Sequence, residues 1–153
     1  GIKRRFQKIG DANGITIYDD YAHHPTEVRA TLTAARAAFP ERRIVALFQP
    51  HLFTRTRDFA GDFGRALAEG ADVFALTDIY KAREQPIEGV SAQLIADAAT
   101  QAGRAPKWFG LREDATAALR ALVQPGDVVL TMGAGDVTLV GPELLAALQG
   151  TSA

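Results

Sequence analysis

The stretch Tyr18–Val28, with the sequence YDDYAHHPTEV, joins the end of an apolar run to the start of a helix. The apolar run Ile15–Tyr18 is rich in β-branched and aromatic residues, which is typical of a strand. Pro25 suits the first position of a helix, where its missing N–H costs nothing, and Glu27 complements the helix dipole in the first turn. Ligands in open α/β sheets bind outside the carboxyl ends of the strands, so the polar loop between this strand and helix is the first candidate site.

The same change from apolar run to helical pattern recurs along the whole chain. The chain opens with a weakly alternating strand from Lys3 to Ile9, a turn-rich link at 10–14 and the strand from Ile15, with Asn13-Gly14 as a strong hairpin signal. Further buried strands are expected at 44–48, 72–77, 107–109 and 127–132. Helices are expected at 25–39, from about 58 to 70, at 91–103, at 112–122 and from 133 to about 149. Gly70 is expected to cap the second helix, and Pro142 can break the last one into two pieces.

Strands that alternate with helices indicate βαβ units. We therefore predict an α/β fold: one Rossmann-like three-layer domain with a mostly parallel sheet and helices on both faces. A chain of 153 residues suits one domain and can bury a sizeable core. The sequence begins with Gly1 instead of methionine, and we expect it to be part of a longer protein.

Composition excludes several classes of protein. The 17 basic and 18 acidic residues give a net charge of −1, which offers no electrostatic footprint for nucleic acid or an anionic membrane. The chain has no cysteine, so it can form neither a disulfide nor a thiolate zinc site, which fits a cytosolic protein. No apolar run approaches the ~20 residues that a membrane span needs, and no apolar region of a signal peptide follows the basic start.

The loop after Tyr18 holds two pairs of candidate residues. Asp20 and His23 are predicted to face a ligand at the strand end. Asp19 and His24 are predicted to be structural, because side chains of neighbouring strand residues point to opposite faces and a polar side chain is needed at the helix N-terminus.

A second polar loop follows the next buried strand and carries His51, Arg55 and Arg57. Guanidinium groups beside a helix N-terminus suit an anionic ligand, because they bind carboxylate or phosphate in a bidentate manner. We assign Arg55 to the ligand and expect Arg57 to pair with Asp58 or Asp62.

The remaining motifs are weaker. Gly133-Ala134-Gly135 is similar to the start of a dinucleotide fingerprint, but a tight strand-to-helix turn explains its glycines at least as well. His23, His51 and Asp20 can converge on a metal, yet they lack the fixed ligand spacing of zinc sites, and no metal is assigned. The chain contains no Walker A sequence, so it cannot cradle a nucleoside triphosphate by that route alone.

Several strings of residues together resemble the Mur ligase family. They are Arg4–Gln7, Asp19–Glu27, Phe48–His51, Thr54–Asp58, Gly126-Asp127 and Met132–Asp136. They cover essentially all 153 residues in the family's order, and the DDYAHHPTE string is highly specific. Within the family they resemble the C-terminal domain of the member that joins L-alanine to UDP-N-acetylmuramate.

The resemblance implies that residues 1–153 are one domain of a larger enzyme. The family has an N-terminal domain for the UDP-sugar and a central domain that carries the P-loop and binds most of the ATP and Mg²⁺; neither is in this chain. The C-terminal domain receives the amino acid and closes over the ATP. The implied enzyme is a cytoplasmic, ATP-dependent ligase of peptidoglycan precursor synthesis, which forms an acyl phosphate that the alanine amine displaces. Its implied partners are L-alanine, ATP, UDP-N-acetylmuramate and its own other domains, and the isolated domain is expected to be inactive.

The resemblance also assigns roles to five residues. Arg5 matches an arginine that reaches the ATP phosphates when the domains close, and Asp20 matches an aspartate associated with the ATP ribose. His23 is implied to be catalytic, beside the reacting groups. His51 and Arg55 match the loop that receives alanine, with Arg55 on its carboxylate. Some relatives carry arginine after the histidine of Phe-Gln-Pro-His, where this chain has Leu52.

Three alternatives stay open. A sibling ligase that adds a tripeptide to the same sugar nucleotide shares the Asp-Asp-Tyr/Phe-Ala-His-His-Pro loop, although Phe48–His51 favours the alanine enzyme. A stand-alone nucleotide-binding or regulatory module would come from a gene without an upstream P-loop. A metal hydrolase that uses His23, His51 and Asp20 would contain metal when purified.

Overall fold

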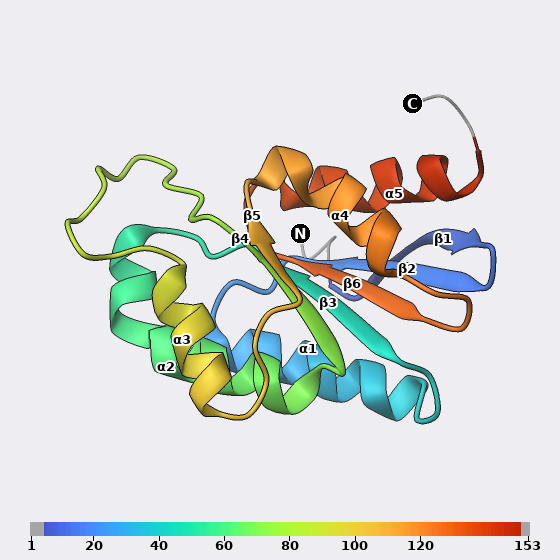
Figure 1. Cartoon of the computed structure of the whole chain (residues 1–153), viewed down its shortest axis with the longest axis horizontal. Coiled ribbons are helices and arrows are strands. Elements are labelled where there is room, and N and C mark those ends of the chain that lie inside the picture. The colour runs from blue at the N-terminus through green and yellow to red at the C-terminus, as the bar shows by residue number, and fades with distance from the viewer. Residues whose placement is uncertain (1–4, 151–153) are drawn as a thin grey trace.

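Figure 1 shows a central sheet between two layers of helices in the computed structural model, which describes residues 5–150. The strands are β1 (Gln7–Ala12), β2 (Ile15–Asp20), β3 (Ile44–Phe48), β4 (Val73–Thr77), β5 (Trp108–Gly110) and β6 (Val128–Met132). The α-helices are α1 (Pro25–Ala38), α2 (Phe53–Gly70), α3 (Gln93–Gln101), α4 (Ala115–Leu122) and α5 (Val140–Leu148). Short 3₁₀ helices η1 (Arg112–Asp114) and η2 (Asp136–Leu139) precede α4 and α5.

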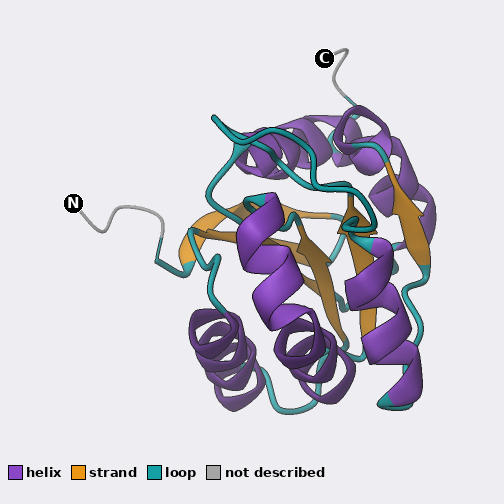
Figure 2. Ribbon diagram, turned by 90° about the vertical axis from the view of Figure 1, so that its left-hand side faces the viewer, coloured by secondary structure: helices purple, strands orange, loops and turns teal. Residues whose placement is uncertain are grey.

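The sheet has the strand order β1-β2-β6-β3-β4-β5, and all its neighbouring pairs are parallel except the hairpin of β1 and β2. Helices α1, α2 and α3 cover one face, and α4 and α5 cover the other (Figures 1 and 2). This division follows from right-handed crossovers, because the chain runs outward from β2 to β5 and then returns to insert β6 beside β2. The predicted α/β class, with a mostly parallel sheet between helices, is confirmed.

The insertion of β6 creates a topological switch point. The loops after β2 and β3 lead to helices on one face, whereas the turn after β6 leads to helices on the opposite face. A crevice opens where neighbouring strands send their following loops to opposite sides, and ligands of open α/β sheets bind there. The first candidate loop therefore lies at the edge where the fold favours a site.

Each face of the sheet has its own apolar core. Phe48, Phe63 and Phe74 are fully buried between the sheet and α1–α3, while Val129 and Leu119 belong to the core under α4 and α5. Every residue of β3 and β6 is buried, which confirms the prediction that such continuous apolar runs are strands covered on both faces.

The N-terminal hairpin is confirmed, but its first strand begins and ends later than predicted: it begins at Gln7, and Arg5 and Phe6 form a bend. Strand β1 continues to Ala12, with a bulge between Lys8 and Gly10, so the predicted link at 10–14 shrinks to Asn13-Gly14. Both turn residues have positive φ, 54° and 78°, as the mirror-image hairpin turns require. The predicted start of this strand at Lys3 and Arg4 lies outside the described residues.

The predicted start of the second helix is wrong. Helix α2 begins at Phe53, five residues before Asp58, so Arg55 and Arg57 lie on the helix and not in a loop. The reason is a distant partner: Glu84, from the loop after β4, accepts hydrogen bonds from the Thr54 N–H, at 3.0 Å, and from the Thr54 hydroxyl. A cap supplied from thirty residues away leaves no local signal in the sequence.

Gly70 does not cap α2 as predicted. It is the last residue of the helix, and the following Ala71 has an extended backbone with φ −103°. A Cβ atom at Gly70 would lie 2.8 Å from Cδ1 of Leu32, so the glycine lets α1 pack closely on α2.

The last helical segment is divided, as expected, but ahead of Pro142. The break separates η2 from α5 at Leu139–Val140, and Pro142 lies in the first turn of α5. Proline is tolerated there because the first helical N–H groups have no partner within the helix.

Candidate active site

Four loops meet at the carboxyl ends of the parallel strands, and aromatic side chains from three of them form a row. The His23 ring lies 6.0 Å from the His51 ring, and the His51 ring stacks on that of Tyr80, with centroids 5.4 Å apart and an interplanar angle of 22°. The fourth loop, Gly133–Gly135, follows β6. Two of the predicted site residues, from separate loops, are thus brought together.

Glu27 holds the first loop in place. Helix α1 has His24 as its N-cap residue, and Glu27 Oε1 accepts hydrogen bonds from the backbone N–H groups of His23 and His24, both at 3.1 Å. Glu27 Oε2 lies 3.7 Å from Nη1 of Arg5, so one carboxylate connects three candidate residues. Burial alone raises the pKa of Glu27, but the hydrogen bond from His23 and the positive charges of His23 and Arg5 lower it below its usual value.

His23 is fixed in one tautomer by its contacts. Its Nδ1 lies 2.8 Å from the carbonyl oxygen of Tyr21, and a carbonyl oxygen can only accept, so Nδ1 carries the proton. In the neutral ring, Nε2 then keeps a lone pair that can accept a hydrogen bond or a proton. The edge of the ring also packs against Tyr21, at 4.9 Å and 75°.

Asp19 and His24 both make structural contacts within the domain. Asp19 is buried and accepts hydrogen bonds from the hydroxyls of Thr131, at 2.7 Å, and Thr138, at 3.0 Å. The His24 ring packs against Phe59, with centroids 4.9 Å apart. These contacts tie the ends of β2 and β6 together and seat α1 on α2.

Asp20 is buried, contrary to the prediction that it faces a ligand beside His23. It is the last residue of β2 and is only 2% exposed. Its Oδ1 accepts the Ala22 N–H at 2.8 Å and its Oδ2 accepts the Phe6 N–H at 2.6 Å. The carboxylate thus fixes the loop and the residue next to Arg5, and its contact with the ATP ribose stays a prediction.

His51 is a neutral, half-buried imidazole. Burial lowers the pKa of His51, and the positive charges of His23 and Arg55 lower it further, against a weaker opposite effect of Glu84. Its Nδ1 is buried without a hydrogen-bond partner in residues 5–150. The following residue, Leu52, has φ 75° and ψ 138°, a conformation that costs about 1–3 kcal/mol for a side chain other than glycine. Such strain is typical of backbone held in position at a functional site.

Arg55 and Arg57 of α2 differ in their pairing. Arg57 is exposed and bonds to Oδ1 of Asp58 at 2.9 Å, so its predicted ion pair is confirmed. Arg55 is half-buried and makes no side-chain ion pair or hydrogen bond within residues 5–150, although its charge acts on His51. Arg55 is therefore a cation in the first turns of α2, beside His51, that is not committed to a partner carboxylate there.

Gln49 and Tyr80 lie at this edge but were not among the site residues predicted from the sequence. Gln49 donates from Nε2 to Oδ1 of Asp136 at 2.8 Å and accepts the Val137 N–H on Oε1 at 3.2 Å. A Cβ atom at Gly135 would lie 2.6 Å from Cγ of Tyr80 and 2.7 Å from Oε1 of Gln49. The glycine therefore permits close packing of the turn, which supports the structural explanation of this motif over the dinucleotide one. These contacts depend on the pairing of strands that are distant in sequence, so no local pattern predicts them. The capping role of Glu27, by contrast, could have been predicted from its position three residues after His24.

Among residues 5–150, no group of three or more His, Cys, Asp or Glu side chains is arranged to hold a metal ion. No helix in the same residues is both long and apolar enough to cross a membrane.

Comparisons with known proteins agree on one family. The sequence profile described as "Mur ligase, glutamate ligase domain" matches residues 4–135. UDP-N-acetylmuramate–L-alanine ligase of Cutibacterium acnes is 53% identical over 151 residues, which are 98% of this chain and 32% of that protein. This chain thus spans about a third of the length of the curated relatives it matches.

Solved structures give the same result. The UDP-N-acetylmuramate–alanine ligase of Thermotoga maritima superposes with a TM-score of 0.76 at 27% identity, over 98% of this chain and 31% of that chain. A murein peptide ligase of Psychrobacter arcticus superposes with a TM-score of 0.78, also at 27% identity, over 100% of this chain and 31% of that one.

Proposed function

The chain belongs to the Mur ligase family, and from that premise we propose that it is the C-terminal domain of a UDP-N-acetylmuramate–L-alanine ligase. The 53% identity to an enzyme of that name over nearly the whole chain carries this choice. The two solved structures do not separate the alanine ligase from the sibling ligase, because each is 27% identical to this chain. Residues 1–153 would form one domain of a cytoplasmic ATP-dependent ligase of peptidoglycan precursor synthesis, with the P-loop in another part of the protein.

The proposed reaction joins two substrates with ATP as the third. The lactyl carboxylate of UDP-N-acetylmuramate takes a phosphoryl group from ATP and becomes an acyl phosphate. The amine of L-alanine attacks the acyl carbon, so that a C–N bond forms, the C–O bond to phosphate breaks, and phosphate leaves. The ammonium form of alanine must lose protons for this attack, and the domain therefore needs a carboxylate-binding cation and proton acceptors near the amine.

The cluster of His23, His51 and Arg55 provides these groups. We assign the alanine carboxylate to Arg55, because its guanidinium has no carboxylate partner among residues 5–150. Burial is the main cause that lowers the pKa of His51 from 6.5, and the positive charge of Arg55 adds to it; the neutral ring is therefore favoured at pH 7 and can accept an N–H of the amine. Nε2 of His23 has the free lone pair in the neutral ring, and we assign it the proton that the attacking amine releases.

The side of the loop that holds Arg5 is assigned to ATP. The side chain of Arg5 is 45% exposed, and its Nη1 atom lies 3.7 Å from Oε2 of Glu27, beyond hydrogen-bond distance. This loose pair leaves the guanidinium free to bind a phosphate. Asp20 fixes the backbone at Phe6 beside it, so we assign Asp20 a positioning role toward Arg5 in addition to the predicted contact with the ribose. The described residues hold no carboxylate cluster for Mg²⁺, so the metal of an ATP-dependent reaction would be bound by the central domain.

The parent protein provides the test. The purified full-length protein should release phosphate only when ATP, UDP-N-acetylmuramate and L-alanine are all present, and mass spectrometry should find the alanyl amide. The 153-residue chain alone should release none, because it has no Walker A sequence. Turnover with a tripeptide and not with alanine would identify the sibling ligase instead. A parent protein without a P-loop would favour a binding module.

A further inference from the structure

Tyr80 is held rigidly against the proposed alanine site. It follows β4, and its backbone N–H donates to the carbonyl of Pro50 at 2.8 Å while its carbonyl accepts the Leu52 N–H at 2.9 Å. These two bonds form a parallel bridge between His51 and Tyr80. They also hold Leu52 in its strained conformation, so the loops after β3 and β4 are locked together at this point.

The Tyr80 ring lies between His51 and the turn after β6, with 37% of the residue exposed. One face of the ring stacks on His51, at 5.4 Å and 22°. The same ring lies so close to Gly135 that a Cβ atom there would approach Cγ at 2.6 Å and Cδ2 at 2.8 Å. The ring therefore has little freedom to move away from His51 toward the turn.

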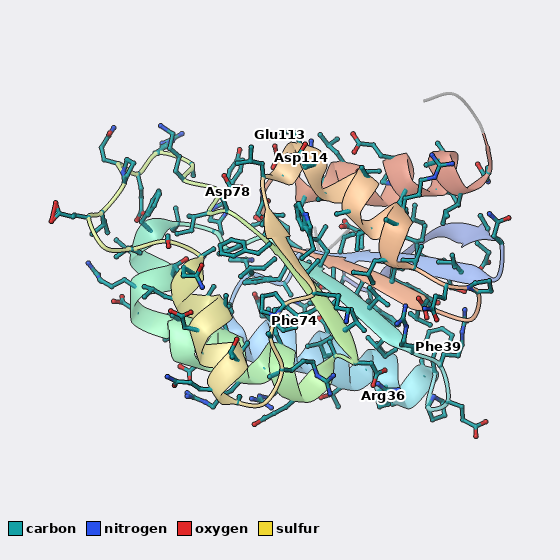
Figure 3. All side chains as sticks on the ribbon, in the orientation of Figure 1. Arg36, Phe39, Phe74, Asp78, Glu113 and Asp114 are labelled. Atoms are coloured by element: carbon teal, nitrogen blue, oxygen red, sulfur yellow. The ribbon has the colours of Figure 1, made fainter. Side chains whose placement is uncertain are left out.

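Tyr80 also lines an acidic pocket of about 440 Å³, whose lining includes neither His51 nor Arg55. Its lining includes Tyr80 and Gln49, with the charged side chains of Asp78, Lys81, Arg112, Glu113 and Asp136. Three carboxylates thus face two cations, and Figure 3 shows Asp78 and Glu113 at the same edge of the sheet. Burial raises the pKa of Asp78, and the negative charges of Glu113 and Asp136 raise it further, against the hydrogen bond from the Arg112 N–H.

Arg112 does not neutralise this lining fully. Its Nε and Nη1 atoms are buried without hydrogen bonds in residues 5–150, and its nearest carboxylate oxygens, on Asp136 and Glu143, lie at 3.6 and 3.5 Å. Loosely paired charges of net negative sign favour a small cation such as an ammonium group.

We propose that Tyr80 is the wall that limits the size of the amino acid, because its ring separates the His51–Arg55 site from the acidic pocket. This inference rests on the proposed function. With the ring present, an α-amino acid on Arg55 and His51 has room for a small side chain only. Without it, the site and the pocket join, and a longer side chain that ends in an ammonium group gains both space and matching charge.

The test uses the full-length enzyme with three amino acids: L-alanine, L-ornithine and L-norvaline, which has the carbon chain of ornithine without the ammonium group. In Tyr80→Ala, the ratio of kcat/KM for ornithine to that for alanine should rise at least about tenfold, since side-chain fit in a pocket is worth roughly 10- to 200-fold. The norvaline ratio should rise less, because the pocket is polar. Tyr80→Phe keeps the ring and should leave both ratios within about twofold of the wild-type values.

Two outcomes overturn the proposal. Unchanged ratios in a folded Tyr80→Ala enzyme would show that the ring is not the wall, and an equal gain for norvaline and ornithine would remove the acidic pocket from the account. Should Tyr80→Ala fail to fold, Tyr80→Leu, which keeps an apolar side chain but removes the ring, is read by the same ratios. A wild-type enzyme that does not ligate alanine refutes the proposed function, whereas an active wild type with unchanged variants refutes this inference alone.

Discussion

Replacing Glu27 by alanine should weaken both the stability of the domain and the order of its first site loop. The Glu27 carboxylate accepts the backbone N–H groups of His23 and His24, each at 3.1 Å, and lies 3.7 Å from the Arg5 guanidinium. The alanine variant leaves both N–H groups without these acceptors. It also removes the anion from the first turn of α1, where the helix dipole favours a negative charge.

The size of the loss follows from these contacts. Loss of a helix cap costs about 1 kcal/mol, and the second N–H adds roughly 0.5–1 kcal/mol. The Arg5 pair adds at most about 0.5 kcal/mol, because its side chains are 45% and 34% exposed and solvent screens the charges. Glu27→Ala should therefore lower the free energy of unfolding by about 2 kcal/mol, or Tm by roughly 5 °C for a domain of this size.

Urea and thermal unfolding, followed by circular dichroism at pH 7, measure this loss. Glu27→Gln is the matched control, because its amide oxygen can still accept both N–H groups while the charge is gone. We expect Gln to lose less than half of what Ala loses. Equal losses in the two variants would mean that the charge and not the cap matters, and a loss below about 0.3 kcal/mol for Ala would refute the role given to Glu27.

Three further predictions concern the fold and its titration. Gly64→Ala places a Cβ atom 2.6 Å from Cβ of Ala98 and should lower the free energy of unfolding by about 1–3 kcal/mol. Gly61→Ala on the same helix meets only the flexible side chain of Arg65 and should raise the free energy of unfolding by up to about 1 kcal/mol. Equal effects of the two variants in urea unfolding would refute this account of α2–α3 packing. The pKa of Asp78 in the folded protein is raised above its unfolded value of 3.8, so the wild type loses stability as pH rises and this carboxyl ionises. The free energy of unfolding of Asp78→Asn should therefore increase relative to that of the wild type between pH 3 and pH 7. Parallel pH profiles of the two proteins would contradict this prediction. The pKa of His51 is lowered from 6.5, so the wild type loses stability as pH falls below about 6.5 and the imidazole must be protonated. Between pH 7 and pH 5, the free energy of unfolding measured in urea should fall less for His51→Gln than for the wild type. An equal fall in both proteins would argue against burial of the neutral ring.

The sequence predicted the sheet and most helices because their signals are local. The apolar run of β3 needs no partner to be recognised, and Asn13-Gly14 specifies its hairpin turn by its own backbone preferences. Where the prediction was wrong, the deciding contact came from far along the chain. Glu84 starts α2 five residues early, so that Arg55 lies on a helix, and no pattern around Phe53 shows it.

The candidate site, like the fold, was predictable only where its signals are local. Its residue types were visible in the loops after β2 and β3, since loops at the carboxyl ends of parallel strands hold ligands in such folds. The buried position of Asp20 could not be predicted from the sequence, because it depends on a hydrogen bond from Phe6, fourteen residues away. The place of Tyr80 beside His51 could not be predicted either, because only the pairing of β3 with β4 brings the ends of these two strands together.

The most direct test of the account is the KM for alanine of the full-length enzyme with Arg55→Ala. Loss of a charged hydrogen-bond donor to the substrate carboxylate costs about 2–3 kcal/mol, so the KM for alanine should rise roughly 30- to 150-fold. The KM for ATP should stay within about twofold, because Arg55 lies on the His51 side of the site and not beside Arg5. An unchanged KM for alanine in a folded variant would remove Arg55 from the amino-acid site and contradict the central claim.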